Sequence, residues 1–205
     1  MKPAVAPTLV VALLIPAFAV AAYQRTRDPD WPCQQIKVPT LSLASVWAGP
    51  PVDPTQSKWQ ENTEVASLVR KIAQRRMPID QARENVNDFA RQSGARKQSQ
   101  MLAAMAGLFD VLNQERDSVI AGLDRFGARQ KTLAEGIRSE NEKLQAMQAD
   151  PHADPQAVQK LTNQTTLDVQ MFEDRRQALR YACDVPGKIE QRLFALAQAI
   201  QQDLQ

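Results

Sequence analysis

Residues 99–149 read SQMLAAMAGLFDVLNQERDSVIAGLDRFGARQKTLAEGIRSENEKLQAMQA, and this stretch decides the fold. With Leu102 at position a of a seven-residue repeat, eleven of the fourteen a and d positions are apolar. The three exceptions are Arg116, Gln130 and Glu140. A repeat sustained over so many heptads is typical of a coiled-coil helix. We therefore predict one helix over residues 99–149, about 75 Å long at 1.5 Å per residue.

The sequence DPHADP at residues 150–155 ends this helix and begins another, because Asp154 is a good N-cap and Pro155 a good first helical residue. Residues 155–204 carry heptads of their own, and their phase continues across Pro186. We predict one further long helix with a kink near that proline. A turn this short between two heptad helices indicates an antiparallel helical hairpin. In the expected register, Phe126 faces Leu179, and Leu112 faces Leu193.

Two shorter helices are predicted before the hairpin, over residues 57–76 with Ser57 as N-cap and over residues 79–92 with Gly94 as the stop signal. Extra apolar residues beside the main seam gather in residues 100–125 and 185–204. We expect the shorter helices to pack there. The 126–179 part, which lacks such extra residues, should project as a two-helix prong. The predicted fold is all-α, with residues 57–205 forming a single domain.

Residues 23–56 are predicted to form an extended arm, because six prolines interrupt any long regular element. The arm also carries apolar side chains, including Trp31 and Trp47, that are costly to leave in water. We therefore expect it to lie across the helical body. The segment from Ser42 to Ala48 fits either a short helix or a strand-like piece.

Residues 1–22 read MKPAVAPTLVVALLIPAFAVAA and have the three parts of a secretory signal peptide: a basic residue, an apolar run and a small-residue cleavage pattern. An uncleaved membrane anchor is the alternative, but Pro7 and Pro16 leave a central apolar run that is short for a membrane span. The pattern predicts export to the periplasm by the general secretory route. Association with the inner membrane is expected only if the segment is retained.

Two cysteines, Cys33 and Cys183, remain after removal of such a signal. In an oxidising compartment this pair predicts a disulfide, and the alternative is two unrelated buried thiols. In the chain-entropy model, a bridge closing so long a loop stabilises the fold by at most about 4 to 5 kcal/mol. The bridge would fix the arm halfway along the hairpin.

The first predicted helix carries a basic run, Arg70, Lys71, Arg75 and Arg76. It is a candidate for docking an acidic partner or an anionic lipid surface, although a solvated face balanced by nearby glutamates accounts for the same residues. Trp31 and Trp47 are either core anchors or part of a recognition patch. The net charge of +2 and the export signal argue against a nucleic-acid partner.

No catalytic or metal-binding motif is present in the sequence. The single histidine, His152, lies between Asp150 and Asp154 in the turn, where helix-capping aspartates at a solvated tip explain the pattern as well as a weak metal site does. Catalysis near neutral pH usually needs a histidine, a perturbed carboxylate pair or an activated nucleophile. We therefore expect no enzyme, no cofactor and no metal.

These features lead us to expect an exported, non-enzymatic helical interaction, scaffold or accessory protein, which presents its hairpin to a protein partner in the cell envelope. The alternative is a membrane-anchored sensory or ligand-binding helical bundle. That alternative requires a pocket between the helices, for which Arg116 and Gln130 are the inward polar candidates.

The export prediction is tested by the intact mass of the protein recovered from the cell envelope. We expect a mass that lacks residues 1–22, because a signal peptide is removed during export. A mature mass that still includes those residues would contradict cleavage and favour the anchor.

Overall fold

The predicted long helix is α3, which runs from Lys97 to Ala149. The computed structural model describes residues 28–54 and 57–205; it is 76% helical, and no strand occurs in the described ranges. The apolar segment of residues 1–22 lies outside them. The remaining elements are η1 (Leu43–Ser45), η2 (Trp59–Glu61), α1 (Thr63–Ile72), α2 (Ile79–Gln92), η3 (Gly94–Arg96), α4 (Pro155–Cys183) and α5 (Val185–Asp203).

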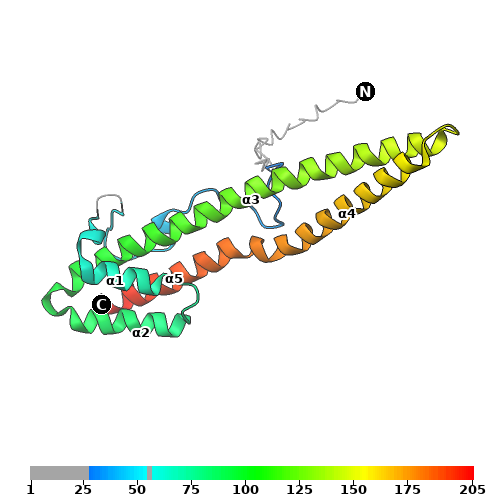
Figure 1. The fold of residues 1–205 in the computed structure, drawn as a ribbon. Coiled ribbons are helices and arrows are strands. Elements are labelled where there is room, and N and C mark those ends of the chain that lie inside the picture. Colours follow the sequence, from blue (N-terminus) through cyan, green and yellow to red (C-terminus); the bar gives the residue numbers. More distant parts are fainter. Residues whose placement is uncertain (1–27, 55–56) are drawn as a thin grey trace, which may run out of the picture.

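The predicted antiparallel hairpin is confirmed: α3 runs out to the tip, and α4 followed by α5 returns along it (Figure 1). At the tip, the Asp154 side chain accepts a hydrogen bond from the Gln156 amide at 3.0 Å, and Pro155 lies in the first turn of α4. The Asp150 side chain accepts from the His152 amide at 2.9 Å. The aspartates around the histidine therefore cap the turn, as expected for a solvated tip.

The bend near Pro186 is confirmed, and it divides the predicted long helix into two, α4 and α5. α4 ends at Cys183, and Asp184 lies between the two helices. Pro186 then lies in the first turn of α5. Proline fits a first helical turn because its missing N–H has no partner there, whereas in mid-helix its ring clashes with the preceding turn. The chain therefore starts a new helix just before the proline.

The two shorter helices also form, but the first starts and ends inside its predicted range of 57–76: α1 spans Thr63–Ile72. α2 spans Ile79–Gln92 as predicted, and Gly94 after it has a φ of 52°, a backbone conformation that favours glycine. The first predicted helix divides into η2 and α1, and its N-cap is Asn62 rather than Ser57. The Asn62 side chain accepts hydrogen bonds from the amides of Glu64 and Val65, which satisfies donors that a helix start leaves unpaired.

α1 and α2 pack against one end of the hairpin, α1 on α3 and α2 on α5, as predicted (Figure 1). The seam residues Met105, Leu112, Leu193 and Ile200 are fully buried at this end. Beyond the bundle, seam residues of α3 such as Leu133 and Leu144 are only partly buried, because two helices alone cover less surface than four. That part is the predicted prong.

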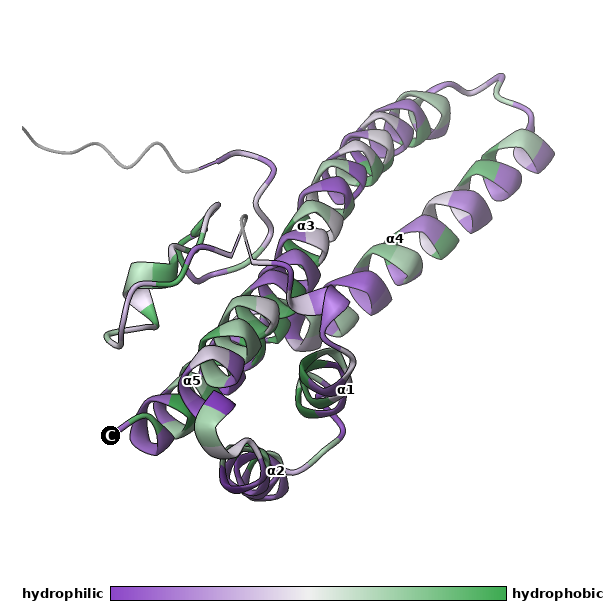
Figure 2. Ribbon diagram, turned by 90° about the vertical axis from the view of Figure 1, so that its left-hand side faces the viewer, coloured by the Kyte–Doolittle hydropathy of each residue, from purple (hydrophilic) through white to green (hydrophobic). Residues whose placement is uncertain are grey.

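The arm lies along the hairpin on the side opposite α1, as Figure 2 shows. Within the Ser42–Ala48 segment, Leu43–Ser45 form a short 3₁₀ helix, η1, and no strand is present there. Trp47 is buried in the core, with its Nε1 donating to the Pro50 carbonyl at 2.7 Å. Gly127 gives the arm room: a Cβ there would stand 1.8 Å from the Asp30 carbonyl oxygen. Gly127 is therefore a point where the arm crosses α3.

Arg192 of α5 joins the end of α1 to the hairpin. Its Nε and Nη2 donate to the Ile72 carbonyl at 2.8 and 2.6 Å, and its Nη1 donates to the Met77 carbonyl at 2.8 Å. The last carbonyls of a helix lack donors within the helix, and this guanidinium supplies them. Burial lowers the pKa of Arg192, and the negative charge of Glu115 opposes that shift.

We expect Arg192→Met to lower the free energy of unfolding by about 2 to 4 kcal/mol, because it leaves the Ile72 and Met77 carbonyls without their charged donor. The exposed Arg180 of α4 provides a matched control, and Arg180→Met should change stability by less than about 0.5 kcal/mol. Urea unfolding followed by circular dichroism measures both. Equal midpoints for the two variants would contradict the assigned role.

Candidate interaction surface on the hairpin

The hairpin has two flanks, one on each side of the seam between α3 and α4–α5. Heptad positions b and e lie on one flank, and positions c and g lie on the other. Residues at e, among them Ile120, Gly127 and Cys183, lie beside the arm. Residues at c and g of the bundle end, among them Ala104 and Leu108, are fully buried on the side where α1 packs. We call the first flank the arm side and the second the bundle side.

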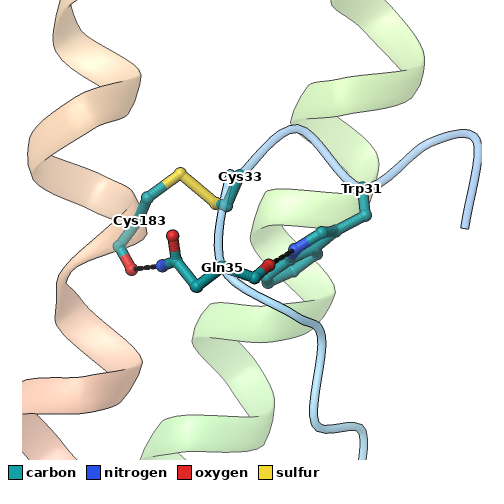
Figure 3. Close-up of a disulfide and its surroundings, with 4 residues drawn as sticks. All are labelled: Trp31, Cys33, Gln35 and Cys183. Carbon is teal, nitrogen blue, oxygen red and sulfur yellow. Dashed lines mark hydrogen bonds between the residues drawn. A yellow bond between two sulfur atoms is a disulfide. The ribbon is translucent and has the colours of Figure 1, made fainter. Parts of the chain in front are cut away.

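The arm side is held by the predicted disulfide (Figure 3). Cys33 and Cys183 are bonded, with their Cα atoms 5.6 Å apart, and both are buried. The Gln35 side-chain amide donates to the Cys183 carbonyl, and Trp31 Nε1 donates to the Gln35 carbonyl at 2.7 Å. These contacts fix the arm where α4 ends and α5 begins.

An ion cluster fixes the arm to α3 near the bridge. Lys37 Nζ lies 2.8 Å from Asp124 Oδ1 and 2.6 Å from Asp28 Oδ2, and it stands 5.7 Å from the centre of the Trp31 ring. The Asp124 and Asp28 carboxylates raise the pKa of Lys37, and the bond to Lys37 lowers the pKa of Asp28. The raised pKa of Lys37 stabilises the folded arm, and this stabilisation is lost only when the pH rises above that pKa. The lowered pKa of Asp28 also stabilises the folded arm, and this stabilisation is lost only when the pH falls below that pKa. The cluster therefore stays charged across neutral pH.

Arg116 points inward, as the sequence suggested, and is 1% exposed. Its Nε donates to Glu190 Oε1 at 2.6 Å and its Nη2 to the Val38 carbonyl at 2.5 Å. A hollow of about 500 Å³ lies beside it, between the arm and the start of α5. Gln130 is also buried, and its amide donates to the Phe172 carbonyl at 3.3 Å. The charge of Arg116 is thus already balanced by Glu190, and the guanidinium joins three segments of the chain.

Beyond the loop that joins α1 and α2, none of the elements in residues 28–54 and 57–205 packs over the bundle side of the hairpin. There the hairpin carries an apolar hollow of about 230 Å³, which we call the open groove. Phe126 and Leu179 both line the groove, as the predicted register requires. Gly122 and Ala178 also line it, and their small size leaves the groove unfilled. The full lining is Val119, Gly122, Leu123, Phe126, Ala178, Leu179 and Ala182.

Large apolar side chains that face solvent lie on the face of α4 that carries the groove residue Ala178: Tyr181 beside the groove, and Met171 and Leu167 further toward the tip. Leu167 is 60% exposed, Met171 37% and Tyr181 79%. All three occupy c or g positions, so they share one face of α4 with Ala178. The a and d positions from which this helix was predicted do not include this stripe. Its signal was the spacing 167, 171, 178 and 181, which follows one helix face.

The predicted partner-binding residues fall on two different sides. Arg70, Lys71, Arg75 and Arg76 are exposed at the end of α1 and in the loop after it, on the bundle side. Arg75 pairs with Glu115 of α3 at 2.7 Å, and Lys71 donates to the Asn85 side chain. Trp31 and Trp47 belong to the arm on the other side. Of the basic run, Arg75 therefore contacts α3 at Glu115, one heptad before the groove residue Gly122, and the tryptophans lie on the other side.

In the described part of the chain, no three His, Cys, Asp or Glu side chains are grouped closely enough to hold a metal ion. No helix within the same ranges has the length and apolarity of a membrane span. Comparisons of the chain with protein-family models, curated proteins and solved structures found no match. The functional argument therefore rests on the surfaces described above.

The exposed stripe should contribute little to folding. We expect Leu167→Ser combined with Tyr181→Ser to change the free energy of unfolding by less than about 1 kcal/mol, since exposed side chains bury little surface in the monomer. Leu123→Ala, which removes a buried side chain beside the same groove, should cost about 2 to 4 kcal/mol. Urea unfolding measures both. A double variant as unstable as Leu123→Ala would mean that the stripe serves the fold.

Proposed function

We propose that this protein is an exported, non-enzymatic interaction protein of the cell envelope, which presents its helical hairpin to a protein partner. Export is inferred from the signal-like residues 1–22, and a disulfide between Cys33 and Cys183 is compatible with an oxidising compartment. The heptad pattern favours coiled-coil packing along the prong. A scaffold protein and an accessory subunit of a larger assembly are both forms of this function.

One observation carries the proposal: the open groove and the stripe beside it leave large apolar side chains in water. Full burial of a leucine or methionine side chain is worth about 1.5 to 3 kcal/mol. Scattered exposed apolar residues are ordinary, but here Leu167, Met171 and Tyr181 share one face of α4 with Ala178, which lines an apolar hollow. Asp174 separates Met171 from Ala178 on this face, so the apolar side chains form two neighbouring groups, and exposed apolar groups on one face support protein binding.

The sensory or ligand-binding alternative would use the hollow beside Arg116. A ligand pocket normally offers polar groups that are free to fix the ligand. Arg116 instead pairs with Glu190 and donates to the Val38 carbonyl. Of the two inward candidates, Arg116 therefore has protein partners already, and the Gln130 amide donates to the Phe172 carbonyl, which favours the interaction function.

The proposal is tested by photo-crosslinking in intact cells, with a photoreactive phenylalanine analogue in place of Tyr181. We expect a defined adduct with one envelope protein, because Tyr181 is 79% exposed beside the groove. The control position is Gln177, which is exposed on the outer face of α4 and should give no such adduct. The additional change Leu167→Ser should weaken the Tyr181 adduct.

The absence of any adduct at position 181, in cells where the protein is exported and folded, would overturn the proposal. Identical adducts at positions 181 and 177 would also contradict it, since they would indicate contact without a defined surface.

A further inference from the structure

We infer that the open groove binds an amphipathic α-helix of the partner, with carboxylates along its edges, in line with α1. This inference rests on the proposed function and specifies the partner's chemistry. Grooves between packed helices bind such helices through apolar anchors spaced three and four residues apart. The occupant, its position and its charge are each supported by separate features of the hairpin.

The first feature is continuity with a helix-binding surface that the protein already uses. α1 lies on the bundle side of α3, over the fully buried Met101, Ala104 and Leu108. Glu64 of α1 accepts from Gln100 at 2.9 Å, and Arg75 beyond α1 pairs with Glu115 at 2.7 Å. α1 therefore runs in the same direction as α3 and points its C-terminal end toward the open groove.

The second feature is that the g positions of α3, which α1 covers at the bundle end, have no helix packed over them beyond α1 among the described residues. The g positions of α3 that follow Leu108 are Glu115, Gly122 and Arg129. Glu115 contacts the α1–α2 loop, and Gly122 is the next g position and lines the open groove. At Gly122, an added Cβ would meet only Arg125 Nη2, at 4.0 Å. Beyond the end of α1, there is therefore space for a partner helix over the apolar residues of the groove.

The third feature is charge. Arg125 and Arg129 border the groove on α3, are exposed, and have no ion-pair or hydrogen-bond partner for their side chains among the described residues. Arg76, in the loop at the groove's near end, is exposed as well. Between residues 118 and 181, Asp174 is the one acidic residue at a c or g position. The border is therefore positive and complements carboxylates.

The same charge argues against a second copy of this chain as the occupant. Two open grooves placed face to face would bring Arg125 and Arg129 of one copy near the same arginines of the other. Like charges brought together in an interface are unfavourable, which gives specificity against that pairing. An acidic helix from a different protein meets no such repulsion.

The test uses the full chain in cells and the photoreactive analogue at position 181. We expect Arg125→Glu and Arg129→Glu each to reduce the adduct yield roughly fivefold, and the two together to reduce it further, because each removes an attractive charge and adds a repulsive one. Arg138→Glu is the matched control: Arg138 is an exposed arginine at a b position of α3, on the other flank, and its substitution should leave the yield unchanged.

The partner segment is then identified by mass spectrometry of the crosslinked peptide. We expect apolar residues spaced three and four apart with Asp or Glu beside them. A synthetic peptide of that segment should bind the purified protein, and the same peptide with each Asp and Glu replaced by Lys should bind roughly tenfold more weakly. A proline placed at its centre should also abolish binding, because proline breaks the helix.

Several results would overturn the inference while leaving the interaction function intact. These are adduct yields insensitive to both arginine substitutions, an adduct peptide from this chain itself, and equal binding of the proline-containing peptide. Failure to form any adduct at position 181 would instead count against the proposed function. The two failures are therefore distinguishable.

Discussion

The packing of α3 against α4 and α5 along one apolar seam is the constraint on which the rest of the structure depends. A two-helix hairpin buries its seam but leaves both flanks in water, and it is stable only where something covers them. At one end α1 and α2 cover one flank and the arm covers the other, so Leu112 and Leu193 are fully buried there. Away from that end, the seam residues are only partly shielded.

Polar contacts hold α1, α2 and the arm on the hairpin, and they join residues that are distant in the sequence. Arg192 donates to the carbonyls that end α1, and Arg116 joins α3, α5 and the arm through Glu190 and the Val38 carbonyl. Each arginine is buried, and buried charge is tolerated because its donors are satisfied. Together with the disulfide, these contacts set how far each cover extends along the hairpin.

The bundle side of the hairpin is exposed where α1 and α2 end. The α1–α2 loop ends near Glu115, and beyond it the bundle side has no cover among the described residues. Small residues at Gly122 and Ala178 leave a hollow, and Leu167, Met171 and Tyr181 share the face of α4 that carries Ala178. We propose an interaction protein and an acidic helical partner because this side combines an apolar groove with the exposed arginines Arg125 and Arg129.

The sequence by itself determined the hairpin, the turn at Asp154 and Pro155, and α2, because heptad spacing and capping residues act between residues that are close in the chain. It also determined the pairing of Cys33 with Cys183, because only two cysteines are present and they can pair in one way. It misplaced the N-cap at Ser57, since alternative caps differ by small energies, and it predicted the bend near Pro186 within one helix where the structure has two. Only the tertiary structure decided which flank is bare, that Gly127 admits the arm, and that Arg192 caps α1. Those outcomes depend on which distant segments meet, and spacing along one helix does not specify that.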